Sequence, residues 1–220
     1  MHYPQEAADP WWGMQQDLQE QEETVGITVK EGSGEFQQAP TGTHIGICYR
    51  IIDLGTQEPN NPNYDPARKI ILEFELPGET LEIDGIKKPF TISNWYTASL
   101  SEKANLRRDL QGWRGRQFTP EELQGFDLKN ILGKAAMLSV VASDKGKSYI
   151  SSISALPKGM PVPEQFNVNT FFSLEDFSRG VFEELPAGIR RIIEKSPEYQ
   201  SINGTASKDE ILEMKDDIPF

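Results

Sequence analysis

The sequence has little of what catalytic and metal sites usually require. It contains one cysteine, Cys48, and two histidines, His2 and His44, among 220 residues. A single cysteine excludes a disulfide framework within the chain, and zinc sites and Cys–His or Ser–His pairs lack the residues to build them. No glycine loop of the P-loop or dinucleotide-binding kind is present. We therefore expect a protein that is not an enzyme, with no catalytic residue, metal ion or cofactor.

Long apolar runs are also absent, and none reaches the length needed to span a membrane. The first residues, MHYPQEAADPWWG, lack the basic start and apolar stretch of a signal peptide. A chain of this length suffices for one domain with a full core plus extensions. The expectation is a soluble protein of the cytoplasm, without membrane association.

Positive charge is scarce overall, because the net charge is -12. Its distribution is uneven. Residues 1–35 hold eight acidic residues and one basic residue, and residues 201–220 hold five acidic and two basic residues. Residues 85–160 reverse the balance, with twelve basic and six acidic residues. Acidic ends therefore flank a basic middle, and this local asymmetry bears more on binding partners than the total does.

Composition divides the chain into four parts. Residues 1–38 are rich in Gln, Glu and Gly and predict a disordered acidic tail. Within it, Trp11-Trp12 is a docking motif, a base-stacking pair or a pair packed on the protein's own surface, and we favour the last. A nucleic-acid-binding domain is expected over 39–158, an extension packed on it with a short helix over 159–200, and a flexible acidic tail over 201–220.

Alternation of apolar and polar residues predicts five strands. In the first, Ile45, Ile47, Tyr49 and Ile51 fall on one face. In the second, Ile70, Leu72, Phe74 and Leu76 alternate with Glu73 and Glu75, and TLEIDG follows as a short hairpin arm; in the third, Phe90 and Ile92 share a face. The predicted strands span 43–55, 68–79, 88–99, 134–143 and 147–156, the last two joined by the turn SDKG.

Helical signals lie between the third and fourth strands. Ser99 and Glu102 form a capping-box pattern that predicts a helix over 99–113, and Thr119 and Glu122 form a second one. A helical turn is expected over 126–133 and a short helix over 185–195. The predicted order along the chain is three strands, a helical insertion and two strands. This is the order of a five-stranded OB barrel, a mainly β fold. Other small barrels or sandwiches share this order, so it does not decide between them.

A basic and aromatic stretch from residue 87 to residue 118 indicates nucleic-acid binding. Single-strand binders combine positive charge for phosphates with flat side chains for bases, and Trp95 falls on the strand face opposite Phe90 and Ile92. Lys103 and Arg107 lie four residues apart on the predicted helix. The candidate nucleic-acid-binding residues are Arg50, Lys69, Lys87, Lys88, Trp95, Tyr96, Lys103, Arg107, Arg108, Trp113, Arg114, Arg116, Phe118 and Tyr149.

Each of these residues also has a structural alternative. Trp113 lies on the apolar stripe of its helix with Leu106 and Leu110, which favours the core. Tyr96 has the strand parity of Phe90 and Ile92, so the core is the alternative position for it too. The arginines of the helix are equally compatible with a solvated face. A metal-dependent nuclease remains as a minor alternative, with carboxylates drawn from Asp53, Glu73, Glu75 and Asp84.

The chain ends in Asp216, Asp217, Ile218, Pro219 and Phe220. An acidic run ending in these five residues at the extreme C-terminus resembles the tip of bacterial single-stranded DNA-binding proteins. The resemblance implies that the tip recruits replication and repair proteins. From the tip alone, a chance tail is an equal alternative.

The stretch from PFTISNWYTAS to FDLKNILGK resembles phage-encoded single-stranded DNA-binding proteins with an OB core, a resemblance that covers about residues 43–200. It implies a role in phage DNA replication, recombination or repair inside a bacterial host cell, with single-stranded DNA as the ligand. A homo-oligomer is one possible state. The alternative from another class is a phage structural or assembly protein that binds no DNA.

Overall fold

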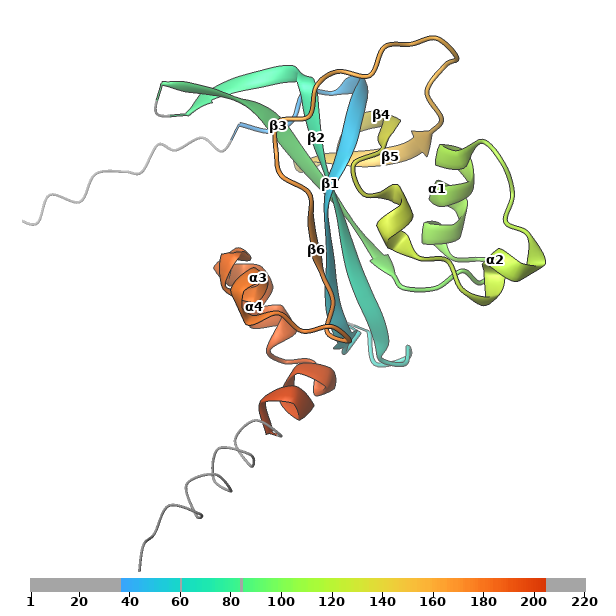
Figure 1. Ribbon diagram of the computed structural model, residues 1–220, viewed down its shortest axis with the longest axis vertical. Helices are drawn as coiled ribbons and strands as arrows, with labels where there is room; N and C mark the ends of the chain where they lie inside the picture. The colour runs from blue at the N-terminus through green and yellow to red at the C-terminus, as the bar shows by residue number, and fades with distance from the viewer. Residues whose placement is uncertain (1–36, 60, 84, 205–220) are drawn as a thin grey trace, which may run out of the picture. The chain divides into compact units, whose positions relative to one another are not determined.

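The computed structural model describes residues 37–59, 61–83 and 85–204 and shows a mainly β protein. Six strands form one sheet in the order β3-β2-β1-β4-β5, with β6 beside β1 (Figure 1). Neighbouring strands are antiparallel except β6, which runs parallel to β1. The strands are β1 (Gly42–Gln57), β2 (Ala67–Ile83), β3 (Ile86–Thr97), β4 (Ala135–Ala142), β5 (Ser148–Ser154) and β6 (Thr170–Phe172).

Two groups of short helices accompany the sheet. Three lie between β3 and β4 in sequence, and the others follow β6. No helix in the described part of the chain is both long and apolar enough to cross a membrane. The helices are α1 (Asn105–Arg114), α2 (Pro120–Gln124), the 3-10 helix η1 (Leu128–Ile131), α3 (Arg179–Glu184) and α4 (Ala187–Ile193), and residues 197–204 are also helical.

The predicted mainly β fold and its strand order are confirmed, whereas closure of the sheet is not. The five predicted strands correspond to β1 to β5, and the predicted hairpin arm is the paired end of β2 and β3. β3 and β5 lie near each other. They share no ladder of hydrogen bonds within the described residues, so the sheet is open between them.

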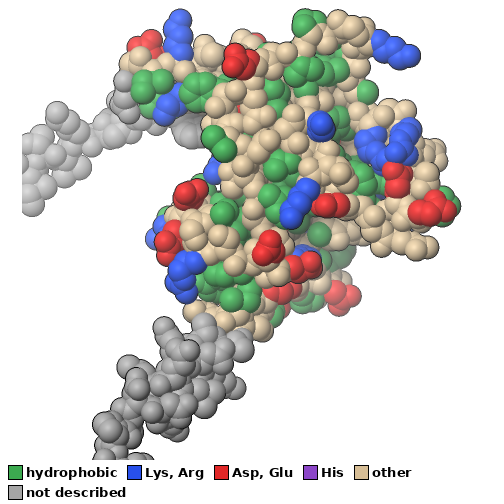
Figure 2. Space-filling view, in the orientation of Figure 1, with side chains coloured by type: hydrophobic (Ala, Val, Ile, Leu, Met, Phe, Trp, Pro, Cys, Tyr) green, Lys and Arg blue, Asp and Glu red, His purple; other side chains and the backbone are tan. Residues whose placement is uncertain are grey.

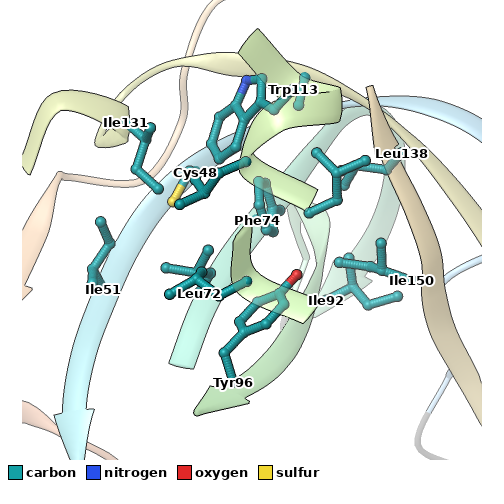
Figure 3. Close-up of a cluster of buried hydrophobic side chains, with 14 of the residues drawn as sticks. Cys48, Ile51, Leu72, Phe74, Ile92, Tyr96, Trp113, Ile131, Leu138 and Ile150 are labelled. Carbon is teal, nitrogen blue, oxygen red and sulfur yellow. The ribbon is translucent and has the colours of Figure 1, made fainter. Parts of the chain in front are cut away.

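One face of the sheet buries the larger apolar core, which we call the inner cluster. Leu72 and Phe74 of β2 point into it, as their alternation with Glu73 and Glu75 predicts. Helix α1 covers this face with Leu110 and Trp113, and the rings of Phe74 and Trp113 lie 5.4 Å apart (Figure 3). The indole Nε1 of Trp113 donates a hydrogen bond to the carbonyl of Ala135 at 2.8 Å, so the polar atom of this buried side chain is satisfied.

A bulge in β1 changes which of its residues face the inner cluster. The register with β2 shifts between Cys48 and Arg50, so Cys48 and Ile51 both belong to the inner cluster. The prediction that Ile45, Ile47, Tyr49 and Ile51 share one face is therefore wrong. An extra residue in one strand reverses the parity of all residues beyond it.

The opposite face of β1 and β2 is covered by the C-terminal extension, and we call this second core the outer cluster. Ile52, Leu54 and Ile71 project from the strands into it, against Phe172 of β6 and residues of α3 and α4. Strand β6 extends the sheet at Arg50 to Ile52 of β1. The predicted short helix over 185–195 is confirmed as α4. Its neighbours α3 and 197–204 were not predicted.

Two buried carboxylates hold the extension on the sheet. Asp53 accepts two hydrogen bonds from Arg68 and one from the backbone N–H of Leu174 at 3.1 Å. Burial acts to raise the pKa of Asp53, but these hydrogen bonds and one from Gly55 outweigh it, so the pKa of Asp53 lies below its ordinary value. Glu75 is fully buried and accepts hydrogen bonds from the backbone N–H groups of Phe166 and Asn167, both at 2.7 Å.

The two capping-box patterns have different outcomes. Thr119 and Glu122 cap α2 reciprocally, as predicted. Ser99 and Glu102 do not cap α1, which begins at Asn105 after Ala104. The Ser99 hydroxyl instead accepts the N–H of Ser101 in a tight turn, because local hydrogen bonds of serine compete with the helix.

Candidate nucleic-acid interface

A groove of about 810 Å³ lies where β3 ends and α1 begins. One wall is the loop between β1 and β2, another is the start of α1, and Ile192 of α4 contributes to the rim. Its lining residues are Gln57, Glu58, Pro59, Asn61, Tyr64, Asp65, Ala67, Lys69, Trp95, Tyr96, Thr97, Lys103, Ala104, Asn105 and Ile192.

Trp95 is an exposed aromatic side chain of this groove. It pairs with Ile71 across the β2–β3 ladder and faces away from the inner cluster, as its strand parity predicts. Its side chain is 48% exposed, which is unusual for a tryptophan in a strand. Tyr64, on the loop between β1 and β2, lines the same groove and is 70% exposed. Two flat rings are therefore open to a ligand.

Positive charge accompanies these rings. Lys69 and Lys103 line the groove, and the ammonium group of Lys69 donates to the hydroxyl of Thr97 at 2.7 Å. Glu58 and Asp65 line it too, so the groove combines both signs of charge. Tyr64 is not among the residues predicted from the sequence, although an aromatic residue within the polar loop TQEPNNPNYDPAR is a visible signal.

Three of the predicted aromatic contacts lie in the core instead. Tyr96, Trp113 and Phe118 are all less than a tenth exposed and belong to the inner cluster. The hydroxyl of Tyr96 donates to Asp109 at 2.9 Å, and burial followed by the Asp109 charge raises the pKa of that hydroxyl. Their rings have no free face for a base, so we remove these three residues from the candidate interface.

Helix α1 carries further cations beyond the groove. Arg107, Gln111 and Arg114 follow one another at helical spacing, with Arg108 beside them. Arg107 donates to the carbonyl of Leu100, and Arg108 pairs with Asp109 while remaining largely exposed. Figure 2 shows acidic side chains interspersed with basic ones on the face that it presents.

Arg114 and Arg116 are both occupied by one carboxylate. Each donates to Glu122, whose other oxygen accepts the N–H of Thr119 at 3.0 Å. These hydrogen bonds, that of Arg116 foremost, lower the pKa of Glu122 to about 2. The cluster joins the end of α1 to α2, and it has a structural role whether or not it also contacts a ligand.

The remaining candidates lie apart from the groove. Arg50 pairs with Glu73 and lies over the ring of Tyr49, 5.3 Å from its centroid. Lys87 and Lys88 lie on the hairpin arm, where Lys87 is opposite Glu82. Tyr149 is 48% exposed on β5. None of these residues lines the groove.

The carboxylates of the nuclease alternative do not come together. Asp53 is bonded to Arg68, Glu73 to Arg50, and Glu75 to the backbone of 166–167. Asp84 lies outside the described residues. Across the described ranges, no group of three or more His, Cys, Asp or Glu side chains is placed to hold a metal ion.

Two further predictions fall outside the described residues, namely Trp11-Trp12 and the C-terminal tip Asp216–Phe220. Comparison with known proteins adds no identification, because the chain matches no family model and no curated protein.

Proposed function

We propose that this protein binds single-stranded DNA without strong sequence preference, through the groove that Trp95 and Tyr64 line. The observation that carries the proposal is the pairing of these two exposed rings with Lys69 and Lys103 in one groove. A ring stacks on any base, and an ammonium group contacts any phosphate, so the arrangement favours single strands over a base-specific ligand.

The sheet supports this proposal through its topology. We infer that the strand order, with α1 between β3 and β4, is that of an OB fold whose β3 and β5 approach without a hydrogen-bonded ladder. OB folds bind oligonucleotides on the face of strands 2 and 3 and with the loop between strands 1 and 2. Trp95 and Tyr64 occupy these two positions.

Two further cations of α1, the exposed Arg108 and the half-buried Arg107, would extend the contact to phosphates beyond the groove. Arg107 and Arg108 follow directly from Lys103 and Asn105 at the groove's edge. Each phosphate that a single-strand binder neutralises adds about -0.7 to the slope of log affinity against log salt concentration. We expect binding that weakens steeply with salt despite the acidic net charge of the whole chain.

The proposal includes a second function for the C-terminal tip. Asp216–Phe220 combines an acidic run with an apolar ring, a combination that suits an apolar pocket flanked by basic residues. Together with the resemblance to phage and bacterial single-strand binders, it favours recruitment of replication, recombination or repair proteins in the cytoplasm of a bacterial host.

Fluorescence titration with oligo-dT tests the DNA-binding proposal. We expect oligo-dT to quench the tryptophan fluorescence of wild type. For Trp95→Ala, the anisotropy of dye-labelled oligo-dT, which does not need Trp95 as the reporter, should show a loss of about 1–3 kcal/mol in binding free energy, the usual worth of one stacked base. Because Trp95 is outside the inner cluster, the melting temperature of the Trp95→Ala variant should stay close to that of wild type. Tyr149→Ala is a matched control, since Tyr149 is equally exposed but outside the groove.

The same titration separates the alternatives. Full affinity in Trp95→Ala, with wild-type folding, would place the DNA elsewhere. No binding of any oligonucleotide would favour the structural or assembly protein. Strand cleavage on addition of Mg²⁺ would favour the nuclease.

A further inference from the structure

A second pocket, of about 400 Å³, lies at the far end of α1 from the groove. It opens between the last turn of α1, helix α2, η1 and the start of β4. Its lining combines apolar and cationic side chains. The lining residues are Trp113, Arg114, Arg116, Glu122, Phe126, Asn130, Ile131 and Lys134.

Arg114 is held rigidly in this pocket. Its guanidinium carbon lies 4.5 Å from the ring centroid of Phe118 and 5.0 Å from that of Phe126. One terminal nitrogen, Nη2, bonds to Glu122, whereas Nη1 is buried and has no hydrogen-bond partner among the described residues. A buried donor without an acceptor is unfavourable. Because Nη1 is closed to solvent, Arg114 contributes its positive charge to the pocket and not a free donor.

The other cations leave the pocket with an excess of positive charge. Glu122 is its one carboxylate, and this group already accepts hydrogen bonds from Arg114, Arg116 and the N–H of Thr119. Lys134 is exposed at the pocket's edge, and no ion pair involving its ammonium group is found within the described part of the chain. The pocket therefore favours an anion.

We propose that this pocket binds a backbone phosphate of the same DNA strand whose bases occupy the groove. The inference rests on the proposed function and adds a second, separate contact point. The groove includes Lys103 and Asn105 before and at the start of α1, and the pocket includes Arg114 at its end. Ten helical residues span about 15 Å. This is about four nucleotides at the 3.4 Å rise of a stacked strand.

The surface between groove and pocket favours a nucleic-acid strand over an acidic peptide. Between the two sites, α1 carries Arg107 and Gln111, which are half-buried, and Arg108, which is exposed. A repeating polyanion matches such a row of donors, whereas a peptide with one terminal carboxylate needs only the pocket. The strand would lie along α1.

An oligo-dT length series tests this inference on the full chain. Short oligonucleotides of two or three nucleotides should reach only the groove, and those of eight or more should reach both sites. Lys134→Ala should leave the affinity for short oligonucleotides unchanged. For long ones, it should make the slope of log affinity against log salt less negative by about 0.7, the value for one phosphate. Lys158→Ala, an exposed lysine outside both sites, is the control.

Asn130→Asp provides an independent second variant, because it places a negative charge at the pocket without touching Arg114 or Glu122. It should weaken the binding of long oligonucleotides by at least about threefold at low salt and spare short ones. Equal slopes for Lys134→Ala and wild type with long oligonucleotides would overturn the inference while leaving the proposed function standing. Loss of a DDIPF peptide's binding in Lys134→Ala, with unchanged DNA binding, would assign the pocket to a carboxylate and also overturn it. Failure of every oligonucleotide to bind wild type would remove both proposals.

Discussion

The inner and outer clusters use the two faces of the same strands, but their residues come from very different distances along the chain. The inner cluster draws on strands and helix α1 that follow one another between Ala39 and Ile153. The outer cluster joins Ile52, Leu54 and Ile71 to residues from Phe172 onward. The inner cluster is a core of elements that are close in sequence. In the outer cluster, the strands are covered by residues from Phe172 onward, and we call this C-terminal segment the cover.

The position of the groove follows from this difference. The cover buries the outer face of β1 and β2, but Trp95 on β3 remains half exposed. Ile192 of α4 lines the groove beside Lys69. The groove therefore lies where the cover ends, and one of its walls belongs to the extension.

The largest expected effect tests whether the two clusters form one cooperative unit. Phe74 and Phe172 are both almost fully buried, one in each cluster. Replacing either by Ala should cost about 3–5 kcal/mol of unfolding free energy. If the clusters unfold together, urea titration of both variants will give one transition, monitored by fluorescence and circular dichroism alike. Two separated transitions in Phe172→Ala would show that the cover unfolds independently.

A smaller effect is expected at the carboxylate that fastens the cover. Asp53→Asn removes one of the two ion pairs of Arg68, which keeps its pair with Glu175. We expect a loss of about 2 kcal/mol at pH 7, less than for a fully buried pair because Arg68 is a third exposed. The pKa of Asp53 is lowered in the folded state, so its stabilisation is present above the unfolded pKa of about 3.9 and is lost as the pH falls below it.

Urea denaturation between pH 7 and pH 3 measures this dependence. The stability difference between wild type and Asp53→Asn should shrink as the pH falls below about 4. Asp176→Asn, at an exposed position of the extension, should differ little from wild type at any pH. A difference that stays constant with pH would mean that Asp53 contributes through packing and not through its charge.

The smallest expected effect concerns the end of the chain that follows the cover. Deleting Asp216–Phe220 should leave the unfolding free energy unchanged. Single-strand affinity should be equal or slightly higher at low salt, because the acidic tip no longer competes with DNA for the basic side chains. The effect is small, since attraction between exposed charges is weak and screened by salt. Replication or repair proteins that wild type captures in pull-downs should be absent from pull-downs with the truncated protein. Deletion of Phe220 alone should remove most of them. Retention of the same partners, or loss of DNA binding, would contradict the proposed role of the tip.

The inner cluster could be predicted from the sequence because its strands alternate regularly. Alternation with charged residues predicts that Leu72 and Phe74 face the core. Trp95 has the opposite strand parity to Ile92, which predicts that it lies outside the inner cluster. The bulge at Cys48 could not be predicted in this way, since an inserted residue leaves no mark on the pattern of apolar residues. It reverses the parity of the residues that follow it, so Ile51 lies on the same face as Cys48.

The candidate site was predictable only in part. Clustering of basic residues led to Arg114 and Arg116, but their pairing with Glu122 depends on how α1 and α2 are placed in space. Ile192 joins the groove from nearly one hundred residues beyond Trp95. Long-range contacts of this kind are set by tertiary packing, which local periodicity does not report.

The pairing of β1 with β6 has a consequence for synthesis on the ribosome. Phe172 follows Ile71 in the sequence by about 100 residues. The outer face of β1 and β2 therefore stays uncovered while those residues are synthesised. At typical rates of about 5–20 residues per second, this interval lasts roughly 5–20 s. During that time Ile52, Leu54 and Ile71 form an apolar strip on a nascent chain, open to chaperones and to neighbouring nascent chains alike. The yield of folded protein should therefore depend on the speed of translation across residues 72–172 more than on any codon before them.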